Sequence, residues 1–333
     1  MSGASAAARR PFLKMATAAF LVAGVMGFSP AQAADDMPAV SVVTIVDHLA
    51  LDAFRDGAAE SLKEAGYEPG RTLRWTFQSA QGNNGTAAQI ARKFVGEEPS
   101  AILAISTPAA QAVVAATKKV PVVYGAVTDP VAAQLVRTMG PSGTNVTGVS
   151  DRLVPEKQVE LLRKIVPSVK RVGMVYNPAE SNSVVAKREM KEALQKAGIE
   201  LVEAAAPRSV DVGQAARRLV GKVDLIYSGT DNNVVAAYEA LAKVGNDAKI
   251  PLVAADTGSI KRGAMAVLSV DYRDLGRQAG KQIVKIIKGE APGSLPSETS
   301  ENVVLILNLD AARKQGVEVS EQLKSEASAI LGG

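Results

Sequence analysis

Short apolar runs alternate with longer amphipathic segments through most of the chain. Runs such as 40–46 and 101–105 have the length and apolar character of buried strands, and segments such as 51–65 repeat apolar side chains at helical spacing. Continuous apolar strands that alternate with helices are typical of parallel sheets covered on both faces. The pattern therefore predicts an α/β protein.

The alternation runs twice through the chain. In the first half it predicts strands at 40–46, 73–78, 101–105 and 120–126, and helices at 51–65, 86–95, 109–118 and 131–139. In the second half it predicts strands at 171–176, 200–204, 224–228, 251–255 and 264–270, and helices at 155–165, 183–197, 210–220 and 234–244. A late helix at 275–288 and a last strand at 303–307 are left over.

Two βαβ arrays of similar size predict two doubly wound parallel-sheet lobes, joined by a hinge of several crossovers. We expect the N-terminal lobe to comprise residues 34–148 and 272–298. The C-terminal lobe should comprise residues 149–271 and 299–333.

The first 33 residues have the pattern of a signal peptide. Arg9, Arg10 and Lys14 precede an apolar stretch at 15–28, which is shorter than the roughly 20 residues of a membrane span. Ala31-Gln32-Ala33 then matches the small-x-small cleavage pattern. A buried N-terminal helix is the alternative, but we expect export to the periplasm and removal of residues 1–33.

The basic residues also resemble a twin-arginine export signal. Arg9-Arg10 is followed by Pro11 and by Phe12-Leu13-Lys14. A receptor reads such signals, and the pathway exports folded proteins. Paired basic residues also begin ordinary Sec signals, so both routes stay open.

Charge and cysteine content narrow the function classes. Residues 1–33 hold three basic residues and no acidic ones, so the remainder keeps 35 of the 38 Lys and Arg against 34 Asp and Glu. This balance gives no electrostatic basis for binding nucleic acid or an anionic membrane. Because the chain has no cysteine, we expect no disulfide, no lipid anchor on cysteine and no thiolate metal site.

Polar loops follow the predicted strands at regular intervals. In the first half they are Asp47-His48, Ser106-Thr107-Pro108 and Thr128-Asp129-Pro130; in the second half they are 177–183, 229–233 and Asp256-Thr257. Ligands of open α/β sheets bind beyond the carboxyl ends of the strands. If the lobes face each other, these loops line one cleft that closes by hinge motion.

Several passages resemble the ABC-transporter substrate-binding proteins of the tryptophan/tyrosine-binding type. The passages are 106–112, 126–131, 145–151, 176–183 and 271–276, and they follow one another in register over nearly all of the chain after residue 33. The resemblance implies a periplasmic-binding-protein type I fold, a small organic ligand such as an aromatic amino acid, and an ABC permease in the inner membrane. The first loop departs from the family pattern His-Pro-Ala-Leu-Asp, since Leu49 stands where proline is usual.

Hydroxyl groups in the first half suit a carboxylate. Thr107 before Pro108 has the pattern of an N-cap followed by proline at the first helical position. The free N–H groups of that turn, including that of Ala109, favour an anion. Thr128 follows the next strand and could donate a second hydroxyl. The alternative is that both threonines only cap helices.

Acidic and amide residues in the second half suit an amine. Asp256 and Asp231 each end a strand, where a carboxylate can pair with an ammonium group. The resemblance implies an acidic partner of this kind. By position Asp256 is the first candidate and Asp231 the second, and the alternative is that Asp231 only caps the helix predicted at 234–244. Asn182 and Ser183 could reach across to the ligand carboxylate when the cleft closes, and either could equally be an N-cap.

His48, the only histidine, could bind the ligand from the rim or cap its loop. Tyr227 is one of two tyrosines that end second-half strands, where they could flank a ligand side chain.

Catalytic and metal chemistry are not expected. One histidine and no cysteine argue against a zinc site, and neither a nucleophile elbow nor a phosphate-binding glycine loop is complete. We expect a monomeric transport receptor without a cofactor. A sensory receptor partner and a small-molecule enzyme using Asp47 and His48 remain alternatives, as do an aliphatic amino acid or an unrelated small acid as ligand.

Overall fold

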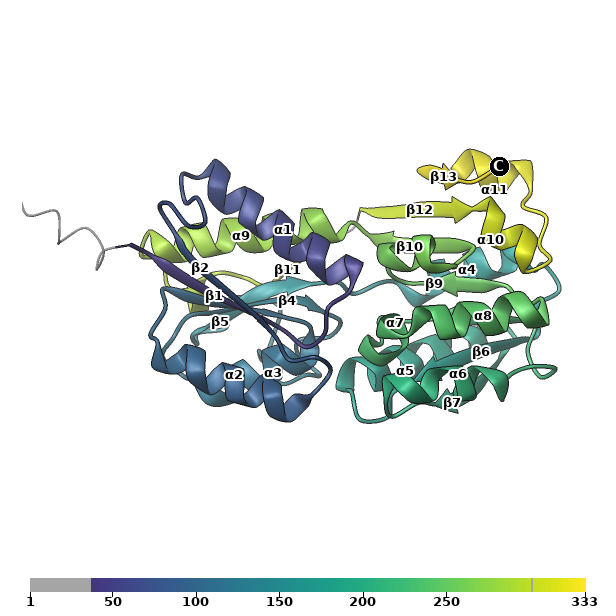
Figure 1. The fold of residues 1–333 in the computed structure, drawn as a ribbon, viewed down its shortest axis with the longest axis horizontal. Helices are drawn as coiled ribbons and strands as arrows, with labels where there is room; N and C mark the ends of the chain where they lie inside the picture. The colour runs from purple at the N-terminus through teal and green to yellow at the C-terminus, as the bar shows by residue number, and fades with distance from the viewer. Residues whose placement is uncertain (1–36, 301) are drawn as a thin grey trace, which may run out of the picture. The chain divides into compact units, whose positions relative to one another are not determined.

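The computed structural model describes residues 37–300 and 302–333. Their strands form two separate sheets, each covered by helices on both faces (Figure 1). The predicted α/β fold with two doubly wound sheets is therefore confirmed. The predicted signal peptide, residues 1–33, lies outside the described residues.

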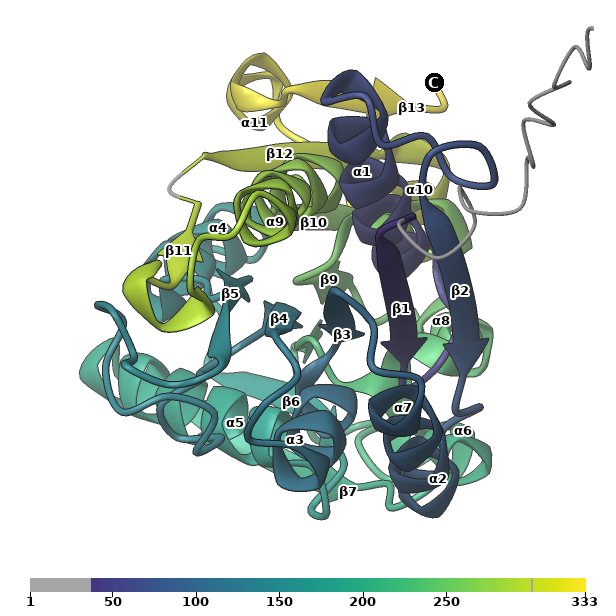
Figure 2. The ribbon, with the colours of Figure 1, turned by 90° about the vertical axis from the view of Figure 1, so that its left-hand side faces the viewer.

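The first sheet is built mainly from the N-terminal part of the chain. Its strands are parallel and lie in the order β11 (Glu298–Thr299), β5 (Val146–Ser150), β4 (Val122–Val127), β3 (Ala101–Ile105), β1 (Ala39–Thr44) and β2 (Arg74–Ser79). Helices α1 (Leu49–Glu64) and α9 (Tyr272–Ile287) cover one face, and α2 (Asn84–Gly96) and α3 (Thr107–Ala116) cover the other (Figure 2). The short helix η3 (Pro292–Ser294) precedes β11.

The second sheet follows the order β13 (Ala329–Leu331), β12 (Val303–Asn308), β10 (Ala266–Val270), β9 (Leu252–Ala254), β8 (Leu225–Ser228), β6 (Arg171–Tyr176) and β7 (Glu200–Ala205). Only the β10–β12 pair among these described strands is antiparallel. One face packs against α4 (Pro155–Ile165), α5 (Ser181–Lys196), α10 (Leu309–Lys314) and α11 (Glu321–Glu326). The other packs against α6 (Val212–Arg217), α7 (Asn232–Ala236) and α8 (Tyr238–Ala248). Two short helices, η1 (Ser209–Asp211) and η2 (Thr257–Arg262), lie in connections.

Helices α1 and α9 pack unusually closely over the first sheet. A Cβ at Gly276 of α9 would lie 1.9 Å from the carbonyl oxygen of Phe54, and a Cβ at Gly57 of α1 would lie 2.1 Å from the carbonyl oxygen of Arg273. The two glycines therefore allow the backbones to touch, and this contact fixes the start of α9 beside the first sheet.

The chain passes between the two sheets in three places within the described residues: after β5, between β10 and α9, and after β11. Strands β5 and β11 both extend slightly past the predicted lobe boundaries at 148 and 298, and those boundaries stay a prediction. Residues 37–333 cluster as one unit. None of the helices described in it combines the length and hydropathy needed to cross a bilayer.

The predicted helix at 131–139 is wrong. The Asp129 carboxylate accepts hydrogen bonds from the N–H groups of Val131 and Ala132, at 3.1 and 2.9 Å, and so closes a single turn. Gln134 then adopts a left-handed conformation with φ of 60°, which ends the turn because non-glycine residues rarely continue a helix from there.

The predicted helix at 234–244 is divided. Ala237, with φ of −110° and ψ of 30°, separates α7 from α8. The Arg262 guanidinium donates to the carbonyl oxygens of Val235 and Ala236, which takes up backbone groups at the end of α7. The chain also continues beyond the strand that we expected to be last, into α10, α11 and β13.

Candidate functional site

A cavity lies where loops from both sheets meet. Its lining comes from the carboxyl ends of β1, β3, β4 and β5 in the first sheet and from the loops that follow β6, β8 and β9 in the second. We call it the polar cavity; it encloses about 300 Å³ of space between protein atoms, counted out to bulk solvent. Its lining consists of His48, Leu51, Ser106, Thr107, Ala126, Thr128, Asp151, Asn182, Thr230, Asn232, Val235, Asp256 and Tyr272.

The turn from β3 into α3 presents two unpaired hydroxyl groups. Ser106, not Thr107 as predicted, occupies the N-cap position, and Thr107 is the first helical residue. Both residues are about 2 % exposed, and neither Ser106 Oγ nor Thr107 Oγ1 has a hydrogen-bond partner among the residues that the structure describes. Two buried hydroxyls without partners beside a helix N-terminus form a donor group for an anion.

This turn is also strained. Ser106 has φ of 82° and ψ of 156°, a region that is almost restricted to glycine and costs about 1–3 kcal/mol. Ala126, which also lines the cavity, has φ of 51° at an irregularity in β4. Strain of this kind gathers at binding sites, where packing holds the backbone in a required shape.

Asp151 follows β5 and carries an unpaired carboxylate oxygen. Its Oδ2 accepts a hydrogen bond of 2.7 Å from the Tyr272 hydroxyl, whereas Oδ1 is buried with no partner in the described part of the chain. Burial raises the pKa of Asp151 above its ordinary value of 3.8. A cation that paired with Oδ1 would remove much of this desolvation cost.

Asp256 lies in the same cavity but has bonding partners. Its Oδ1 accepts from the Ser259 N–H at 3.0 Å and its Oδ2 from the Ser259 hydroxyl at 2.6 Å, so the carboxylate caps η2. Burial raises its pKa as well. Because each oxygen already accepts one hydrogen bond, Asp256 has less need of a ligand than Asp151.

His48 lines the cavity and caps α1. Its Nδ1 accepts from the Leu51 N–H at 3.4 Å. Burial, with the positive charge of Arg262, lowers the pKa of His48 to about 3. The ring is therefore neutral near pH 7, and since Nδ1 accepts, Nε2 carries the proton and is a donor.

Asn182 contributes from the first turn of α5. Its Nδ2 donates to the Thr230 carbonyl oxygen at 3.1 Å and to the Glu180 carboxylate at 3.3 Å, while Oδ1 is buried without a partner. The N-cap of α5 is Glu180, so neither Asn182 nor Ser183 holds that position.

Ser183 and Asp231 lie outside the cavity lining and bind each other. The Ser183 hydroxyl donates to Asp231 Oδ2 at 2.5 Å, and Asp231 Oδ1 accepts from the Val234 N–H at 3.0 Å as the N-cap of α7. Burial, with the nearby charge of Glu180, raises the pKa of Asp231 to about 6. These contacts stabilise the loops that carry Asn182 and Thr230.

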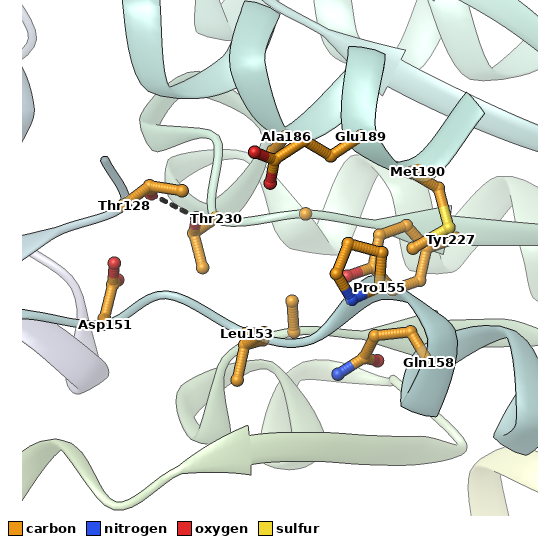
Figure 3. Close-up of a pocket in the computed structure, with 12 residues that line it drawn as sticks. Thr128, Asp151, Leu153, Pro155, Gln158, Ala186, Glu189, Met190, Tyr227 and Thr230 are labelled. Carbon is orange, nitrogen blue, oxygen red and sulfur yellow. Dashed lines mark hydrogen bonds between the residues drawn. The ribbon is translucent and has the colours of Figure 1, made fainter. Parts of the chain in front are cut away.

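Thr128 connects the two sheets. Its hydroxyl lies 3.2 Å from that of Thr230 (Figure 3). Arg152, just after the first crossover, makes a second connection through ion pairs with Asp129 at 3.0 Å and Glu189 at 2.5 Å. Ala109 is fully buried in the core beneath α3 and does not line the cavity; only its backbone N–H stays a candidate.

A second cavity adjoins the polar cavity through Thr128, Asp151 and Thr230, which line both (Figure 3). We call it the side cavity; it encloses about 390 Å³, again counted out to solvent. Its other lining residues are Leu153, Pro155, Gln158, Ala186, Glu189, Met190, Tyr227, Gly229 and Ala255.

The structure thus brings five of the predicted site residues into the polar cavity: His48, Thr107, Thr128, Asn182 and Asp256. Ser106, Asp151 and Tyr272 also line the cavity and were not among the predicted site residues. The sequence did contain an indication for Asp151 and Tyr272, because both lie in passages that resemble the family. Asp151 also directly follows the apolar run that becomes β5.

Comparison with known proteins agrees with this architecture. The family model described as ABC transporter substrate binding protein matches residues 39–331. A tyrosine-binding protein of Clostridioides difficile is 37 % identical over 274 residues, which cover 82 % of this chain and 79 % of that protein. A conserved domain protein of Vibrio cholerae, of known crystal structure, is 43 % identical with a TM-score of 0.87, covering 88 % of this chain and 99 % of that one.

Two further solved structures bear on ligand and fold. An ABC domain of Streptococcus pneumoniae in complex with L-Trp is 30 % identical with a TM-score of 0.85, over 88 % of this chain and 99 % of that one. An ABC transporter solute-binding protein of Bacillus halodurans with bound myo-inositol is only 16 % identical, over 84 % of this chain and 98 % of that one, but reaches a TM-score of 0.60 and shares the periplasmic-binding-protein type I fold. The chain therefore belongs to the family of ABC transporter substrate-binding proteins.

Proposed function

We propose that the protein is the solute receptor of an ABC importer and binds one free α-amino acid with an aromatic side chain between its two sheets. The observation that carries the proposal is the polar cavity. It places unpaired hydroxyls at a helix N-terminus and an unpaired carboxylate oxygen around one space. An α-amino acid carries the two complementary groups, a carboxylate and an ammonium, attached to one carbon atom.

The α-carboxylate is assigned to the N-terminus of α3. Ser106 and Thr107 would donate from their unpaired hydroxyls, and the positive end of the helix would favour the negative charge. Thr128 and neutral His48 lie in the same lining and could add donors. Hydrogen bonds to a charged group contribute about 1.5–3 kcal/mol each, more than bonds between neutral groups.

The α-ammonium is assigned to Asp151. Its Oδ1 is buried and unpaired, whereas the oxygens of Asp256 already accept from Ser259. Tyr272, which donates to Oδ2, would hold the Asp151 carboxylate in place. Asp256 remains the second candidate, because it lines the same cavity.

The side chain of the ligand is assigned to the side cavity, whose walls include the apolar residues Leu153, Pro155 and Met190. Two relatives support an aromatic ligand: the 37 % identical protein is a tyrosine-binding protein, and the 30 % identical structure holds L-Trp. A ligand-free, open structure from Clostridium difficile gives a TM-score of only 0.67 despite 37 % identity, against 0.85 for the L-Trp complex. The described backbone thus resembles the ligand-bound relative more closely.

We place this activity in the periplasm. The predicted signal peptide at 1–33 and the family support export, by the twin-arginine or the Sec route. The partners would be an ABC permease of the inner membrane and the ligand itself, and the receptor would act as a monomer without catalysis.

A thermal-shift screen tests the proposal. The purified protein would be unfolded and refolded to remove bound ligand, then heated with each L-amino acid, common sugars, purines and small carboxylates. A ligand at 100 times its dissociation constant adds about 2.7 kcal/mol of stability, which raises Tm by several degrees. We expect shifts with aromatic amino acids. Shifts with sugars or purines alone would contradict the proposed ligand.

A further inference from the structure

The side cavity contains a buried hydrogen-bond acceptor that no described group satisfies. Gln158, on the first turns of α4, is about 1 % exposed and lines this cavity. Its Oε1 is buried without a partner. In Figure 3 the Gln158 side chain lies below Pro155 and Tyr227, which line the same cavity.

The orientation of this amide is determined by its other end. Gln158 Nε2 donates a hydrogen bond of 2.9 Å to the carbonyl oxygen of Leu268 on β10. A flipped amide would place two acceptors against each other, so the carbonyl end is the one left unpaired. The acceptor is therefore held in place by the second sheet rather than free to turn to solvent.

An unpaired acceptor is not by itself a ligand site. Gln282 on α9 is equally buried, with Nε2 near the carbonyl oxygens of Gly148 and Pro296 and with Oε1 unpaired, yet it lines neither cavity. Gln158 differs because its neighbours in the lining are mostly apolar and enclose a space that adjoins the polar cavity. Gln158 is one of few polar groups among mostly apolar neighbours, and a small number of placed polar groups is the usual way a pocket selects its ligand.

We infer that Gln158 is a specificity-determining residue, which accepts a hydrogen bond from an O–H or N–H group on the ligand's ring. This inference rests on the proposed function, because it requires the ring to enter the side cavity. A phenol or an indole satisfies Oε1, whereas a phenyl ring leaves it buried and unpaired. Sites built to bind a polar group discriminate strongly against an analogue that lacks it.

The direct test is the affinity ratio between L-tyrosine and L-phenylalanine, with 4-fluoro-L-phenylalanine as an analogue that lacks the donor. Calorimetric titration of the refolded protein should give L-tyrosine an affinity roughly 10- to 100-fold above both analogues, the loss expected when a buried acceptor stays unpaired. Equal affinities for all three would overturn the inference and leave the proposed function intact. Failure to bind any of the three, together with failure to bind L-tryptophan, would instead contradict the proposed aromatic ligand.

The Gln158→Met variant separates the acceptor from the shape of the pocket. Methionine has a similar length and no strong acceptor, so the tyrosine-to-phenylalanine ratio should fall toward one, while phenylalanine affinity stays the same or rises. Gln282→Met is the matched control and should keep the ratio of the parent protein. A ratio that persists in Gln158→Met would overturn the inference. If that variant does not fold, the ratio measured on the parent protein still decides.

Discussion

Asp151→Asn is the substitution that distinguishes best between the two candidate partners of the ligand ammonium. Asparagine keeps the size of the side chain and can still accept the hydrogen bond from Tyr272, but it removes the negative charge. Loss of one partner of a buried, hydrogen-bonded charge pair costs about 2–5 kcal/mol. The affinity for an aromatic amino acid should therefore fall by roughly 30- to 4,000-fold.

The assay is calorimetric titration of refolded parent and variant with L-tyrosine and L-tryptophan. Asp247→Asn is the matched control for an Asp-to-Asn substitution away from the cavities. Asp247 is exposed and forms an ion pair with Lys243 at 2.7 Å, so its loss should leave ligand affinity unchanged. Asp256→Asn tests the alternative. Unchanged affinity in Asp151→Asn, with a large loss in Asp256→Asn, would refute our assignment and support the one that the sequence favoured.

Asp151→Asn should also change the free energy of unfolding of the ligand-free protein. Burial raises the pKa of Asp151 above 3.8, so the folded protein binds this proton more tightly than the unfolded chain. Ionised Asp151 therefore lowers stability, and its cost grows as pH rises from about 4 through the raised pKa. The free energy of unfolding of Asp151→Asn minus that of the parent protein should be more positive at pH 7.5 than at pH 4. Urea unfolding at the two pH values measures this difference. A relative loss at pH 7.5 would show that the charge is already compensated.

Three further substitutions test the site and its support. Thr107→Val should weaken amino-acid binding about 10- to 150-fold, because a hydrogen bond to a charged group is lost; unchanged affinity in titration would contradict the carboxylate assignment. Gly276→Ala should lower Tm by several degrees, since the added Cβ meets backbone at 1.9 Å, whereas Gly96→Ala, with nothing within 4 Å, should not; equal Tm values in thermal unfolding would contradict the close packing. Arg152→Gln should weaken binding by less than about fivefold, because its ion pairs are partly exposed; a loss beyond tenfold at physiological salt would indicate a direct role.

The sequence predicted strands and helices well where the apolar residues formed a continuous run or recurred at helical spacing. Strand β3 and helix α4 have the predicted bounds, Ala101–Ile105 and Pro155–Ile165. The helix predicted at 131–139 failed because the Asp129 side chain closes a turn and Gln134 turns left-handed. Such local hydrogen bonds compete with a helix and leave the apolar spacing unchanged.

The site was harder to predict because loops after strands carry many polar residues. The sequence indicated which loops converge, but which carboxylate stays unpaired depends on turn geometry. Asp256 caps η2 and accepts from the N–H of Ser259 three residues later, a spacing that the sequence does contain. Asp151 has no such neighbour and pairs with Tyr272, which is far along the chain. For Gln158, the sequence indicated only a polar residue on the apolar face of the helix that becomes α4.

The polar cavity should bind both charged groups of a free amino acid. The most direct measurement is a calorimetric titration of the refolded protein with L-tyrosine, with tyramine, which lacks the carboxylate, and with 3-(4-hydroxyphenyl)propionate, which lacks the amine. We predict tight binding of L-tyrosine and a loss of at least about 100-fold for each analogue, since each leaves buried polar groups unpaired. If either analogue binds as tightly as L-tyrosine, the polar cavity does not recognise the α-amino acid group, which would contradict the proposed function.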